Sequence, residues 1–160
     1  MTMTHNLDTS AFSRDPEGML AELLGGTVVR YRDRAVEIGL LSEADVLRNL
    51  PGMADAALYR APAGTLVRYA SRDGFRLAIA CHPPEGDGVL TLLGLVSDDD
   101  RLGPAETYAA LGGDLLQGKK IGRESGLWIS LPESPNAWAR DDRLPTGSPP
   151  HRTAYARLLL

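Results

Sequence analysis

Apolar and polar positions alternate along the centre of the chain, most clearly over residues 75–82. Successive side chains of a β-strand point to opposite faces, so a period of two predicts strands. Residues 65–70 and 75–81 form a predicted hairpin, because Ser71–Gly74 between them ends in the Asp-Gly pair that favours a tight turn. In the second strand, which we predict to be half-buried, we expect four side chains to point inward: Phe75, Leu77, Ile79 and Cys81.

The segment Val89–Val96 is almost continuously apolar. A strand that is buried on both faces has this composition, so we predict that the segment lies in the middle of a sheet. The loop that precedes it is short, whereas a parallel crossover needs a dozen or more residues. Neighbouring strands are therefore predicted to run antiparallel.

The flanking segments combine helical and strand periods. A first helix is predicted after the capping residue Asp15, and it ends at Gly25-Gly26. A second short helix is predicted from the capping-box pattern Ser42–Asp45, and a third over residues 104–117. Further strands are predicted as two short strands within 27–41, one strand over 127–131 and a short paired strand within 138–144, while residues 151–160 fit either a short helix or a strand.

Together these elements predict an α+β fold, with an antiparallel sheet of about five strands and two or three helices packed on one face. The length of 160 residues is that of a single domain. Residues 1–14 are polar and lack periodicity, which predicts a flexible N-terminal tail. The single α+β domain is accordingly expected over residues 15–160.

The charge balance of the chain argues against a nucleic-acid partner. The chain has 17 basic and 21 acidic residues, a formal net charge of -4. Its basic residues are scattered, whereas a phosphate-binding surface needs a clustered basic patch. An alternative phosphate or nucleic-acid binder would use Arg30, Arg32, Arg34 and the turn Lys119-Lys120.

No apolar run approaches the roughly 20 residues that a membrane span needs, so we expect no membrane partner. The chain contains one cysteine, Cys81, which excludes an internal disulfide and favours a reducing compartment. No secretory signal is visible near Met1. We therefore expect a cytoplasmic protein, of bacterial origin.

The residue types that carry chemistry do not form a recognisable catalytic motif. Cys81 and His82 are adjacent, and adjacent side chains of a strand point to opposite faces, so we expect Cys81 to be a small buried hydrophobe. The three histidines are too widely spaced for a metal motif, and we predict neither a metal nor a cofactor. An alternative hypothesis is a small enzyme or ligand-binding domain with a pocket between sheet and helix, which would use His82, Asp98, Arg76 and Tyr108.

Three stretches of the chain carry a resemblance to a known class. They are the hairpin run from Gly64-Thr65-Leu66-Val67 to Ile79, the strand Val89–Leu95 with its acidic turn and following helix, and Gly126–Leu131 with the later Arg143-Leu144-Pro145. Their order resembles the type III secretion chaperones typified by the Tir chaperone, and the bacterial YbjN-like domains. The resemblance implies a non-enzymatic dimer that binds an extended segment of a partner protein.

The leading functional hypothesis is therefore a protein-binding module, chaperone-like or inhibitor-like, that acts alone or as a homodimer. A sheet edge and apolar side chains would bind the partner. Trp128 and Leu131 are the candidate contact residues, with Arg76 and Tyr108 as further candidates. Trp128 is expected on the strand face opposite Leu127, where it either anchors a partner or packs beneath a helix.

Overall fold

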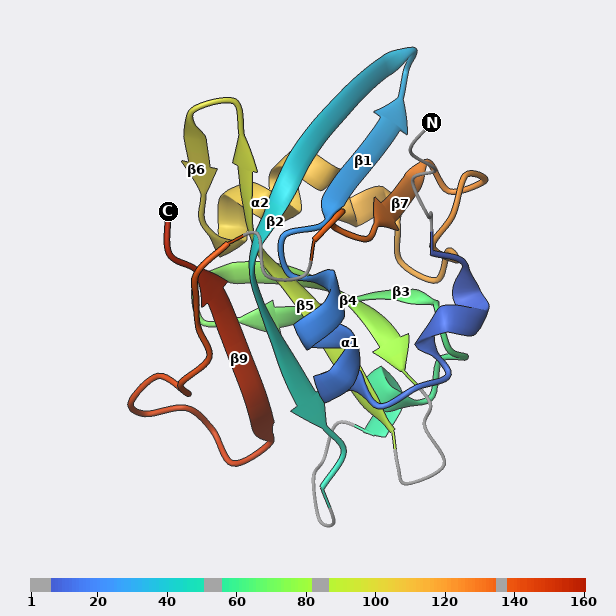
Figure 1. Ribbon diagram of the computed structural model, residues 1–160. Helices are drawn as coiled ribbons and strands as arrows, with labels where there is room; N and C mark the ends of the chain where they lie inside the picture. Colours follow the sequence, from blue (N-terminus) through green and yellow to red (C-terminus); the bar gives the residue numbers. More distant parts are fainter. Residues whose placement is uncertain (1–6, 51–55, 82–86, 135–137) are drawn as a thin grey trace.

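Strand β2 (Ala35–Arg48) runs through nearly the full height of the molecule and connects the two parts of its sheet (Figure 1). The first part of β2 pairs with β1 (Thr27–Arg32), and the part from Leu40 onward pairs with β5 (Gly88–Ser97). Strand β9 (Arg152–Leu158) occupies the other edge of this second part. The register of the β2–β5 pair shifts around Glu43, an irregularity of the kind that bends a strand.

The computed structural model describes residues 7–50, 56–81, 87–134 and 138–160. In these ranges nine antiparallel strands form one sheet with the order β3-β4-β5-β2-β1-β7, to which β6 is added on β5, β9 on β2 and β8 on β9. The remaining strands are β3 (Leu66–Ser71), β4 (Gly74–Cys81), β6 (Asp100–Leu102), β7 (Leu127–Ser130) and β8 (Arg140–Asp141), and the α-helices are α1 (Pro16–Leu23) and α2 (Pro104–Leu111).

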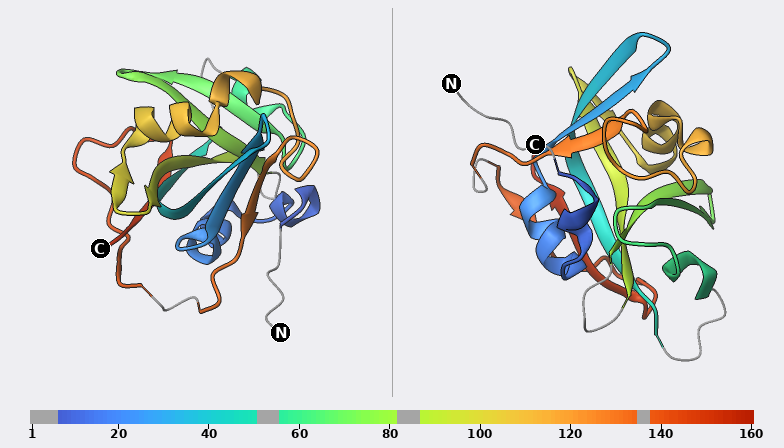
Figure 2. Two further views of the ribbon diagram at one scale, coloured as in Figure 1. Left: turned by 90° about the horizontal axis from the view of Figure 1, so that it is seen from above. Right: turned by 90° about the vertical axis from the view of Figure 1, so that its right-hand side faces the viewer.

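The predicted α+β fold, with about five strands and two or three helices on one face, is wrong. The described residues hold nine strands and only two α-helices, each of eight residues, so the fold is dominated by its sheet. Helix α1 packs against β2, β5 and β9, whereas α2 packs against β4, β5 and β6. Both views in Figure 2 show strands between the two helices, although side chains of both helices belong to the same main core.

The segment predicted as a second helix is the continuation of β2. Leu41, Ala44 and Val46 are fully buried in the main core, while Glu43 and Asp45 point to the opposite face. Val46 and Leu47 are adjacent, and an apolar run this short has no period that distinguishes a helix from a strand. Pairing with β5 and β9 on its two edges decides for the strand, because both edges then form backbone hydrogen bonds.

The other predicted elements agree more closely with the structure. Helix α1 is confirmed, as are the β3–β4 hairpin and the central position of β5. The predicted third helix ends early, because Gly112 adopts a left-handed conformation (φ 65°) that terminates α2. The C-terminal segment is a strand, β9. Within the predicted tail, residues 9–12 form a 3₁₀ turn, and Phe12 is fully buried.

The main core lies on the inner face of the curved sheet and is covered by α1, α2 and the N-terminal turn. Leu77, Ile79 and Cys81 of β4 are buried in it as predicted, but Phe75 is 42% exposed and stacks on Tyr108 with ring centroids 5.9 Å apart. Burial raises the pKa of Cys81 to about 12, consistent with a small buried hydrophobe.

The opposite, outer face of the sheet carries a second, smaller apolar cluster centred on Leu47, Val67 and Val89. This outer face also carries the polar residues described below. Neither α-helix in the described ranges has the length and apolar character that crossing a lipid bilayer requires.

Candidate functional site

Buried polar side chains form a row across the outer face of the sheet. The strand register makes Asp45 of β2 the cross-strand partner of Tyr155 on β9 and of Thr91 on β5. Further along the sheet, the hydroxyl groups of Tyr69 on β3 and Thr91 lie 2.8 Å apart and share a hydrogen bond. Asp45, Thr91 and Tyr155 are at most 9% exposed. Burying this much polarity on one sheet face costs stability unless the groups find partners.

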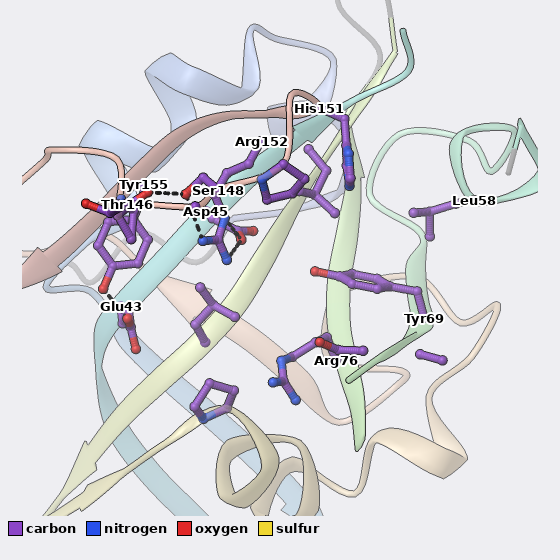
Figure 3. A pocket seen from close by; sticks show the side chains of 18 of the residues that line it. Glu43, Asp45, Leu58, Tyr69, Arg76, Thr146, Ser148, His151, Arg152 and Tyr155 are labelled. Carbon is purple, nitrogen blue, oxygen red and sulfur yellow. Dashed lines mark hydrogen bonds and ion pairs between the residues drawn. The ribbon is translucent and has the colours of Figure 1, made fainter. Parts of the chain in front are cut away.

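A pocket of about 490 Å³ opens over this row (Figure 3). Its floor is the outer face of the sheet, and its walls are the loop that precedes β9, the turn at Ala56–Tyr59 and the first residue of α2. Its volume lies within the range of small-molecule sites. The labelled lining residues are Glu43, Asp45, Leu58, Tyr69, Arg76, Thr146, Ser148, His151, Arg152 and Tyr155.

Asp45 is the most unusual group of the pocket. Its side chain is 1% exposed, and its Oδ2 accepts a 2.8 Å hydrogen bond from Nε of Arg152. Its other oxygen, Oδ1, is buried and has no hydrogen-bond partner among the described residues. Burial raises the pKa of Asp45, and the Arg152 guanidinium and the nearby Thr91 hydroxyl group oppose that rise. An unpaired buried carboxylate oxygen is costly, so a partner from solution would stabilise the protein.

Glu43 and Tyr155 form a second polar pair at the pocket. The Tyr155 hydroxyl donates a hydrogen bond to Glu43 Oε2. Burial, followed by this hydrogen bond, raises the pKa of Tyr155. The Arg152 guanidinium lies 5.6 Å from the centre of the Tyr155 ring, a cation–π contact, and its Nη1 lies 3.4 Å from Ser148 Oγ. Arg152 thus links the carboxylate of β2 to the pocket wall.

Arg76 was a sequence candidate, and the structure places it in this pocket. It is 7% exposed and lies on β4 directly opposite Tyr69 in the β3–β4 register. Its guanidinium donates hydrogen bonds to the Asp73 carboxylate and to the carbonyl of Phe75. Arg76 therefore contributes a positive charge that a protein carboxylate already compensates.

The other sequence candidates that lie in the described ranges are not brought together. His82 lies outside the described residues. Asp98 is exposed in the β5–β6 turn, and Tyr108 on α2 donates a hydrogen bond to Asp114 at 2.6 Å. Trp128 is half-buried, 5.7 Å from the Arg123 guanidinium, and Leu131 packs against the main core. Their roles stay predictions.

Sequence reasoning did not single out Asp45, Arg152 or Tyr155. The helical interpretation of Ser42–Asp45 made Asp45 a capping residue. A strand interpretation of the same residues would have placed Glu43 and Asp45 on one face, because they are two positions apart. Nothing local indicated that β9 would supply Arg152, which is 107 residues away in the chain.

Comparisons with known proteins add no functional assignment: no family model matches the chain, and no curated protein matches it either. Among the described residues, no group of three or more His, Cys, Asp or Glu side chains is arranged to hold a metal ion. The geometry of the pocket is therefore the basis for the function proposed next.

Proposed function

We propose that this protein binds a small polar organic molecule in the outer-face pocket, and that the ligand donates a hydrogen bond to Oδ1 of Asp45. The buried and unpartnered oxygen is the observation that carries the proposal. Buried polar groups in proteins nearly always have a partner, so each exception calls for an explanation, and a functional role is one of them. A ligand donor at this oxygen would remove the cost of leaving it unsatisfied.

The charges of the pocket narrow the ligand class. Each pocket guanidinium already contacts a carboxylate, Arg152 that of Asp45 and Arg76 that of Asp73. An anionic ligand would have to compete with these ion pairs. A ligand with an amine, amide or hydroxyl donor instead satisfies an existing acceptor. The tyrosine and proline side chains in the lining offer apolar surface for the body of such a molecule.

A thermal-shift screen with a panel of amines, amides and polyols tests the proposal. A ligand present at about a hundred times its Kd stabilises the folded state by about 2.7 kcal/mol, which raises Tm by about 5–10 °C. In Asp45→Asn the amide oxygen can accept the hydrogen bond from Arg152. The amide NH2 group then takes the place of Oδ1, and this donor repels the donor of the ligand. We expect this variant to weaken binding at least about tenfold.

Asp98→Asn makes the same chemical change at an exposed turn, and we expect it to bind the ligand like the original chain. Binding should also weaken as the pH falls through the raised pKa of Asp45, because a protonated carboxyl group is a poorer acceptor for the ligand donor. Equal affinities of Asp45→Asn and the original chain would contradict the assignment of this pocket.

A further inference from the structure

Strand β2 extends beyond the end of its neighbour β5. The two strands pair only from Leu40 onward, and β5 ends at Ser97, where Asp98 (φ 54°) turns the chain into β6. The segment Ala35–Gly39 therefore pairs with β1 along one edge, and no described strand pairs with its other edge. Figure 1 shows the β1–β2 hairpin extending away from the β5–β6 hairpin at this end of the molecule.

The backbone of β2 offers hydrogen-bonding groups along this open edge. Leu41 donates its N–H to Gly26 and accepts at its carbonyl from Gly25, so its backbone groups point to the β1 side. Alternate residues of an antiparallel strand direct these groups to opposite sides. The N–H and C=O groups of Val36 and Ile38 consequently point to the open side, like those of Leu40, which pairs with β5.

A groove of about 340 Å³ accompanies the open edge, and we call it the edge groove. It is lined by Val28, Val36, Glu37, Gly39, Leu95, Ser97, Asp98, Leu102, Ala110 and Leu111. Its floor is apolar, with Val28, Leu95 and Leu111 at most 4% exposed. Its charged lining residues are both carboxylates, Glu37 and Asp98. The edge groove thus combines an unpaired strand edge, apolar surface and negative charge.

We propose that the edge groove binds an extended segment of a partner protein as an added β-strand, a segment in which apolar residues alternate with lysine or arginine. Main-chain hydrogen bonds to Val36 and Ile38 would supply affinity, and the apolar floor and the two carboxylates would supply selectivity. This proposal is independent of the outer-face pocket. It keeps the predicted sheet-edge binding of a protein but moves it away from Trp128 and Leu131, which do not line the edge groove.

A second copy of the chain fits the edge groove less well than a basic segment. If the Ala35–Gly39 segments of two copies paired antiparallel, with their middle residues aligned, Glu37 of one copy would lie opposite Glu37 of the other. Like charges directly opposite each other destabilise a strand pair. The charge of the edge groove therefore favours a different, basic partner.

Fluorescence anisotropy with a synthetic peptide tests the proposal. The probe is a labelled seven-residue peptide in which valine alternates with lysine, and a valine–glutamate peptide is its control. We expect the lysine peptide to bind at least about tenfold more tightly than the glutamate peptide. The double variant Glu37→Gln, Asp98→Asn should lose most of this preference, and its unfolding curve checks that it folds, since asparagine tolerates the left-handed turn.

Two further measurements separate strand addition from simple charge attraction. N-methylation of every second peptide amide removes hydrogen-bond donors without changing the charge of the peptide. The amides form two alternate sets, one facing β2 and one facing away. We expect methylation of one of these sets to abolish binding. Bound peptide should slow amide hydrogen exchange at Val36 and Ile38 but leave Glu37, whose N–H faces β1, unchanged. Three results would each overturn the proposal. The lysine peptide could fail to bind, or methylation of either set of amides could leave its binding equal. The chain could also self-associate and protect the amides of Val36 and Ile38 in that way.

Discussion

Replacement of Arg152 with methionine is expected to lower the free energy of unfolding by about 3–5 kcal/mol near neutral pH, the usual cost of removing one partner from a buried ion pair. Arg152 provides the ion-pair partner of Asp45, whose side chain is 1% exposed. Without the guanidinium, Asp45 would remain buried with neither of its oxygens bonded to a cation. Urea unfolding followed by circular dichroism measures the loss.

The pH dependence of this loss distinguishes a buried charge from lost packing. Burial already raises the pKa of Asp45 above the ordinary value of 3.8, and removal of Arg152 should raise it further. A raised folded-state pKa contributes stability below the unfolded pKa, and this contribution is lost as the pH rises through the folded pKa. The deficit of Arg152→Met should therefore be smallest in acid and grow toward neutral pH.

Two matched variants complete the test. Adding Asp45→Asn to Arg152→Met removes the buried charge and should restore part of the stability at neutral pH. Arg143→Met removes an arginine whose side chain is 87% exposed and which pairs with Asp141, so we expect less than about 1 kcal/mol. A loss in Arg152→Met that stayed constant with pH and was not rescued would show that packing alone is responsible.

Replacement of Arg30 with methionine is expected to cost about 2–4 kcal/mol, because the carbonyl groups of Leu111, Ser125 and Tyr31 would lose a donor. Arg30 is 4% exposed. Its Nε donates to the carbonyl of Leu111 at 2.7 Å, and its Nη1 donates to that of Ser125 at 2.9 Å. Leu111 is the last residue of α2, where carbonyls lack helical partners and attract positive charge. Thermal or urea unfolding measures the effect.

Arg32 provides the matched control on the same strand. Its Nη2 lies 3.5 Å from the carbonyl of Ala110, also near the end of α2, but its side chain is only partly buried. We expect Arg32→Met to cost less than about 1 kcal/mol. Similar losses in the two variants would contradict the specific role of Arg30 at the helix end.

The same geometry bears on the alternative of a phosphate or nucleic-acid surface. That hypothesis used Arg30, Arg32 and Arg34 as a basic stripe. Arg30 is buried and bonded to carbonyl groups, so the three side chains do not form a continuous exposed row. An alternating pattern of charge on a strand can thus include one residue that serves packing rather than binding.

Local patterns predicted the elements whose burial follows from their own sequence. The Ser71–Gly74 turn brings β3 and β4 together within a few residues, and Val89–Val96 is apolar enough to occupy a sheet centre without further information. The helix after Asp15 carries its own start and stop signals. In these segments the local preference and the final environment agree, which is why the prediction succeeded.

The sequence by itself determined the antiparallel β3–β4–β5 unit and helix α1, because turn residues and periodic apolar side chains act over short distances. Only the tertiary structure decided that residues 42–48 continue a strand, since β5 and β9 must be in place before both edges of that strand can be paired. The outer-face pocket depends on the same step. Asp45 meets Arg152 and Tyr155 through sheet register, and register between segments more than a hundred residues apart leaves no local signal.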